Sequence, residues 1–136
     1  MLRNIIAVVV GIIVGGAVNL GLVTVGPMII PPPAGADVTT IDGLRAAMPM
    51  MSPLNFLVPF AAHFGGTFVG ALVASLIAVS HKMKIAIGIA IWFLIGGIVA
   101  VVLFPAPLWF EAVDLILAYF PAAWLGAKIG GAGKEA

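Results

Sequence analysis

The stretch AHFGGTFVG, residues 62–70, decides the fold because it combines two features of a membrane-embedded helix. Gly66 and Gly70 form a G-x-x-x-G pair, and alanines continue the four-residue step at positions 62, 74 and 78. On a helix these positions share one face without bulky side chains, so a second helix can approach its backbone closely. His63 lies beside that face, and an ionisable group at membrane depth is costly and marks a candidate functional site.

The composition places the whole chain in a membrane. Of its 136 residues 63% are hydrophobic and 8% are charged, and the mean hydropathy is +1.29. Soluble domains contain about 25% charged residues. The net charge of +1 does not indicate a nucleic-acid partner, and the absence of cysteine excludes disulfides, thiolate metal sites and thiol nucleophiles.

Four apolar runs cover about residues 5–30, 54–79, 85–104 and 108–127. Each has about the 20 residues that a helix needs to cross about 30 Å of hydrocarbon. The runs do not alternate polar and apolar residues, which argues against membrane strands. We therefore expect an all-α membrane protein, a single domain over residues 1–136, with four transmembrane helices in a compact bundle.

The long external loop, residues 31–53, is expected to contain one short helix. Three prolines at 31–33 stop the first span, and Thr39-x-x-Asp42 resembles a capping box. Ile41, Leu44 and Met48 then follow at helical spacing until Pro49. This pattern predicts a short amphipathic helix on the outer membrane surface.

The basic residues predict the orientation. Only Arg45 falls on the side of the long loop, whereas the other basic residues share the opposite side: Arg3, Lys82, Lys84, Lys128 and Lys134. The positive-inside rule then places both termini in the cytoplasm, and we expect a bacterial inner (plasma) membrane.

Small residues predict how the spans pack. In the first span Gly11 and Gly15 continue to Asn19 at four-residue steps, and we expect this face to cross the helix of Gly66 and Gly70. Residues 63–71 also align without gaps on residues 119–127, which places Gly126 opposite Gly70. The alignment indicates either two pseudo-repeated helical hairpins or chance similarity between Gly/Ala-rich spans.

Four polar side chains from three spans are expected to converge in the outer half of the protein: Asn19, His63, Glu111 and Asp114. Depth follows from the rise of about 1.5 Å per residue. Pro121 should kink the fourth span just below them. If His63 and Asp114 face each other, they titrate as a coupled pair. Alternatively, Asp114 caps its own helix and His63 bonds to Asn19.

The polar residues favour transport over catalysis. No metal site is predicted, because an E-x-x-H pair is absent, and no catalytic motif accompanies the histidine. No cofactor can be assigned. We expect a small permease or channel for a solute, a cation or protons, acting as a homo-oligomer in the lipid bilayer. An accessory or assembly subunit of a larger membrane complex is the alternative, followed by a membrane-embedded metal-binding protein or enzyme.

Overall fold

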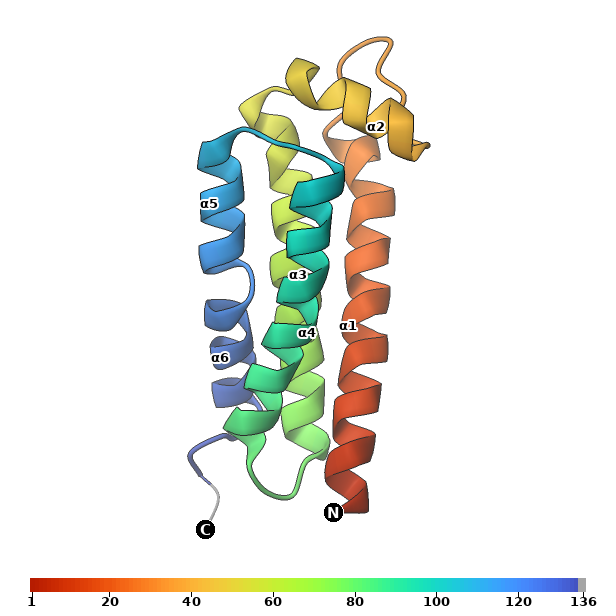
Figure 1. Ribbon diagram of the computed structural model, residues 1–136. Coiled ribbons are helices and arrows are strands. Elements are labelled where there is room, and N and C mark those ends of the chain that lie inside the picture. The colour runs from red at the N-terminus through yellow and green to blue at the C-terminus, as the bar shows by residue number, and fades with distance from the viewer. Residues whose placement is uncertain (135–136) are drawn as a thin grey trace.

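The computed structural model describes residues 1–134, and its regular elements in that range are helices (Figure 1). In chain order they are α1 (Leu2–Ile29), α2 (Ile41–Ala47), η1 (Met48–Met50), η2 (Pro53–Phe56), α3 (Leu57–Ile77), α4 (Lys82–Leu103), α5 (Leu108–Leu117) and α6 (Phe120–Ile129). Within residues 1–134, four segments are long and apolar enough to cross a membrane: Leu2–Ile29, Pro53–Ile77, Lys82–Leu103 and Leu108–Ile129. The chain is therefore all-helical, and its four long apolar segments fit a membrane protein.

Helices α1 and α3 approach so closely that neither has room for side chains at the contact. A Cβ atom at Gly15 would lie 2.5 Å from the carbonyl oxygen of Gly66, and one at Gly70 would lie 2.8 Å from that of Gly11. These distances are shorter than van der Waals contact, so only glycine fits. The two glycine pairs hold α1 directly against α3, which carries His63.

The fourth span is interrupted, and Figure 1 shows the break between α5 and α6. Tyr119 lies at the break, with φ −114° and ψ −75°, and Pro121 occupies the first turn of α6. Pro121 has no N–H to donate to the carbonyl of Leu117, and its ring disfavours helical geometry in the preceding residue. The predicted kink is thus a full interruption, and it lies before Pro121.

The start of α1 is tied to the turn between α3 and α4. The amide of Asn4 donates to the Ser80 hydroxyl at 3.1 Å and accepts the Val79 N–H at 3.1 Å. Arg3 Nε donates to the carbonyl of Ile77 at 2.7 Å. These bonds satisfy backbone groups at and just after the C-terminal end of α3, where carbonyl groups have no partner within the helix.

Helix α2 lies across the opposite end of the spans (Figure 1). Its N-cap is Thr40, whose hydroxyl accepts the Gly43 N–H at 3.0 Å. The expected capping box from Thr39 to Asp42 is therefore wrong: the cap lies one residue later, and Gly43 has no side chain to complete a box. The reason is Asp37, whose carboxylate accepts the Thr39 N–H and hydroxyl and so holds Thr39 outside the helix. Arg45 then ties α2 to the end of α4 through the Leu103 carbonyl at 2.9 Å.

Candidate functional site

The structure brings His63 of α3 into direct contact with Asp114 of α5. The imidazole Nδ1 lies 2.8 Å from Oδ2 and 3.0 Å from Oδ1 of the carboxylate. Asp114 is buried, with 2% of its surface exposed, whereas the His63 side chain is 18% exposed. Both residues lie inside the apolar spans. Of the two arrangements that the sequence left open, this is the one in which the side chains share a site.

Tyr119 completes the cluster, and sequence reasoning missed it. Its hydroxyl donates to Asp114 Oδ2 at 3.2 Å, and its ring stacks near the His63 ring, with 5.8 Å between centroids and an interplanar angle of 30°. The residue is 1% exposed. A straight helix would turn residue 119 away from residue 114, because helical neighbours are three or four positions apart. The interruption before Pro121 allows this five-residue contact.

Two predicted members lie outside this cluster. Glu111 Oε1 accepts the N–H of Ala106 at 3.0 Å, and so closes the turn that precedes α5. The Cβ of Asn19 packs where a side chain at Gly66 would lie, and within residues 1–134 the Asn19 amide has no hydrogen-bond partner. Their depth in the spans resembles that of His63, but depth alone does not determine the direction in which a side chain points.

The contact admits one arrangement in which the pair takes up a proton. If the Asp114 carboxylate is ionised, it only accepts hydrogen bonds, and Nδ1 of His63 then carries the hydrogen that faces it. Nε2 has no hydrogen-bond partner among residues 1–134 and is the nitrogen available for a second proton. With that proton bound, the pair is net neutral. Without it, the site has one net negative charge in an apolar environment.

Metal binding finds little support in the geometry. Among residues 1–134, no group of three His, Cys, Asp or Glu side chains gathers in a way that could hold a metal ion. The cluster offers one imidazole and one carboxylate, and Tyr119 already donates to the carboxylate. These residues suit proton binding better than coordination of a divalent ion.

An apolar groove opens one helical turn from the pair, between the ends of α3 and α5. Its volume is about 460 Å³, and its walls come from Pro53, Leu54, Phe56, Leu57, Phe60, Trp109, Phe110 and Val113. Phe60 precedes His63 by three residues and Phe110 precedes Asp114 by four. Aromatic side chains from both sides meet here, since the rings of Phe56 and Phe110 lie 4.7 Å apart.

Comparison of the chain with protein-family models, with curated proteins and with solved structures finds no match.

Proposed function

We propose that this protein is a small membrane permease or channel that binds and releases a proton at the His63–Asp114 pair. The observation that carries the proposal is the contact of 2.8 Å between Nδ1 and a carboxylate that is 2% exposed, within two membrane spans. Buried ionisable groups in spans are expensive and are typical of proton and ion pathways.

The charge of the pair suggests the type of cargo. If Asp114 is ionised, one negative charge remains when His63 loses its second proton, and among residues 1–134 the Tyr119 hydroxyl is the one other donor to it. An isolated charge in an apolar environment is strongly unfavourable, so a proton or a small cation must compensate it. We therefore infer that the cargo is a proton, or a cation or solute moved in exchange with one.

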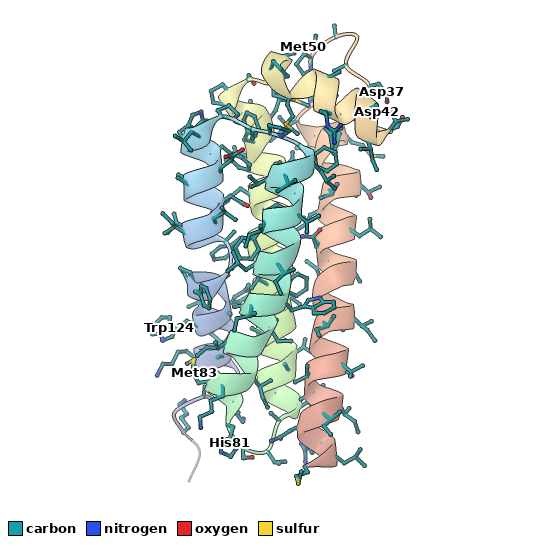
Figure 2. The ribbon with its side chains drawn as sticks, viewed as in Figure 1. Asp37, Asp42, Met50, His81, Met83 and Trp124 are labelled. Atoms are coloured by element: carbon teal, nitrogen blue, oxygen red, sulfur yellow. The ribbon has the colours of Figure 1, made fainter. Side chains whose placement is uncertain are left out.

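The finer architecture is part of the same proposal. The four spans form one compact bundle, with α2 lying on the outer membrane surface and both termini in the cytoplasm. In Figure 2, His81 and Met83 lie at one end of the spans, and Asp37 and Asp42 lie at the other. Lys82 and Lys84, which adjoin His81 and Met83 in the sequence, support a cytoplasmic location for that end. A bundle of four spans encloses little space, so we propose that the protein acts as a homo-oligomer.

The pseudo-repeat and the accessory-subunit alternative have less support. Residues 63–71 lie in the unbroken α3, whereas residues 119–127 begin at the interruption and continue into α6, so the two hairpins differ where they align. An accessory subunit would use stripes of glycine to bind other subunits of a complex. Gly11, Gly15, Gly66 and Gly70 instead face one another within the chain.

Proton flux into liposomes tests the proposal. The purified protein is reconstituted into vesicles that contain a pH-sensitive dye, and a potassium gradient with valinomycin sets the membrane potential. Addition of Na⁺, K⁺ and Li⁺ in turn then tests for cation exchange. We expect flux above that of empty vesicles, and its loss in Asp114→Asn and His63→Gln.

The matched control is Glu111→Gln. This substitution removes a carboxylate from the same helix, one turn from Asp114, but the carboxylate contacts Ala106 instead of His63. It should keep wild-type flux. Wild-type vesicles that conduct no better than empty ones under every gradient, together with co-purification of unrelated subunits, would favour the accessory-subunit function.

A further inference from the structure

Two hydroxyl groups on α3, the helix that carries His63, have no hydrogen-bond partner among residues 1–134. Thr67 follows His63 by four residues and Ser75 follows it by twelve. Both residues are 0% exposed, and their hydroxyl oxygens have no partner within the described residues 1–134. A buried, unbonded hydroxyl is destabilising, so two of them along one helix call for an explanation.

A third hydroxyl in the spans shows how such a group is ordinarily satisfied. Thr24 of α1 donates its hydroxyl to the carbonyl of Leu20, four residues earlier, at 2.7 Å, and it is exposed to the surroundings of the helix. Threonine and serine in membrane helices can satisfy themselves in this way. Thr67 and Ser75 do not, and their hydroxyls remain able both to donate and to accept.

The two hydroxyls lie on one row of α3. Positions 63, 67, 71 and 75 are four residues apart and so form one continuous row, which winds slowly around the helix. Ala71 and Ser75 on this row lie beside Gly126 and Gly130 of α6, where added Cβ atoms would be 3.4 Å and 2.6 Å from their Cβ atoms. The row therefore faces α6 through glycine and alanine, which offer no bulky side chain to obstruct it.

The row ends near the charged end of the protein. Ser75 contacts Gly130, and the carbonyl of Gly130 accepts a hydrogen bond from Lys82 Nζ at 3.1 Å. In Figure 2, this is the end at which His81 and Met83 are labelled. From His63 to Ser75 the row spans about 18 Å along the helix, more than half of a hydrocarbon core of about 30 Å.

We propose that Thr67 and Ser75 are steps of a proton path from the His63–Asp114 pair to the end of the protein at which α3 ends and α4 begins. This inference rests on the proposed function. A proton leaves Nε2 of His63 and is accepted by a hydroxyl oxygen, which releases its own hydrogen to the next acceptor. No covalent bond other than O–H and N–H changes, and each hydroxyl ends with the single hydrogen it had.

Water completes the path past Ala71. Thr67 and Ser75 are about 12 Å apart along the helix. A short file of water molecules, joined by hydrogen bonds of about 2.8 Å, would bridge this distance. Gly126 lies tightly against α3, since an added Cβ would be 2.5 Å from the Phe68 carbonyl oxygen. The path therefore requires α6 to move away from α3 when water enters, and the interruption at Tyr119 is the place where α6 is separated from α5.

The test compares proton flux in vesicles of wild-type protein with that of Thr67→Val and Ser75→Ala. Valine keeps the shape of threonine but cannot carry a proton, so each variant should lose at least tenfold in flux. Thr67→Ser, which keeps the hydroxyl, should restore it. Thr24→Val is the matched control, and it should conduct as the wild type does. Two variants at separate positions keep the test decisive where one fails to fold.

A second measurement separates the path from the site. Nitrogen-15 NMR of His63 reports protonation of the pair in detergent, and its titration should be the same in wild type and in Thr67→Val. If the wild type conducts protons and both hydroxyl variants conduct equally well, the proposed path is wrong but the proposed function stands. Absence of flux in the wild type overturns both.

Discussion

The hydroxyl of Tyr119 lies directly against Gly97 of α4, in the space that any side chain at position 97 would occupy. The same hydroxyl donates to Asp114 at 3.2 Å. A glycine on one span thus sets the position of a buried hydroxyl that bonds to the candidate proton site on another. Gly96, the adjacent residue, has no atom within 4 Å of the place where its Cβ would lie.

The first prediction follows from this neighbouring pair of glycines. Gly97→Ala should displace Tyr119, weaken its bond to Asp114 and lower the free energy of unfolding by about 1–3 kcal/mol, the usual cost of overpacking. Gly96→Ala should be neutral or slightly stabilising, because alanine favours a helix more than glycine does. Thermal unfolding in detergent measures both. Equal stability of the two variants would contradict the predicted contact.

The second prediction concerns the closest helix pair. Gly66→Leu places a bulky side chain against the carbonyl of Gly15 and the Cβ of Asn19, which lie within 3 Å of the new Cβ position. We expect a loss of several kcal/mol or failure to fold, since α1 and α3 cannot then keep their contact. Gly16→Leu is the control, because no atom lies within 4 Å of its Cβ position. Normal expression and melting of Gly66→Leu would overturn the packing.

A third prediction concerns pH and the loop before α2. Hydrogen bonds from Thr39, and then from Thr40, lower the pKa of Asp37 to about 2 from its ordinary 3.8. Because the folded pKa is depressed, the ionised carboxylate stabilises the loop above pH 3.8 and loses this effect as the pH falls towards 2. Carboxyl NMR should show Asp37 still ionised at pH 3. In the Asp37→Asn variant, the protection of the Thr39 amide from exchange, relative to its intrinsic rate, should no longer change between pH 4 and pH 2, and a titration of Asp37 at the ordinary pKa would contradict the bonding.

A fourth prediction tests the orientation. Reporter domains fused at Gly35 and after Lys134 should report opposite sides of the membrane, with the one after Lys134 in the cytoplasm. Five of the six basic residues, all but Arg45, favour this arrangement. The control is a double variant, Lys82→Glu with Lys84→Glu, which should weaken the orientation bias. An external reporter after Lys134 would reverse the proposed topology.

The spans were predictable because the hydrophobicity of about 20 consecutive residues adds up to one clear signal. Each segment found in the structure lies within a few residues of its apolar run. The interruption of the fourth span was predictable only in outline. Proline signals a defect, but whether the helix bends or breaks depends on what the neighbouring helices accommodate, and here Gly97 provides the space for Tyr119.

The candidate site was predictable in part for a related reason. Depth along a helix is proportional to residue number, so the levels of His63 and Asp114 could be estimated from the sequence. The direction of a side chain depends on how each helix is rotated in the bundle. That is why Asn19 and Glu111, at similar depths, point elsewhere. Tyr119 was missed because a five-residue spacing is not a helical one, although the proline two residues later was the available signal.

The last prediction asks whether the His63–Asp114 pair serves stability or function. Removing one partner of a buried charged pair leaves the other uncompensated, at a typical cost of about 3–5 kcal/mol. We therefore expect His63→Phe to be strongly destabilised, because Asp114 then keeps, within the described part of the chain, the Tyr119 hydroxyl as its one side-chain donor. The measurement is reversible unfolding in mixed detergent.

Replacing both partners by apolar residues separates the two roles. Well-packed apolar substitutes for a buried pair are often neutral, or stabilising by about 1–4 kcal/mol. His63→Phe with Asp114→Leu should thus recover the stability that His63→Phe loses, which a double-mutant cycle expresses as a coupling energy. The double variant should fold, yet bind no proton and conduct none. If the pair served stability alone, proton flux would fall in the destabilised His63→Phe variant and return in the stable double variant. If the double variant is stable and conducts protons as well as the wild type, the pair has no part in transport. If the double variant is stable and conducts no protons, the protein keeps this costly buried charge for the proton that it carries.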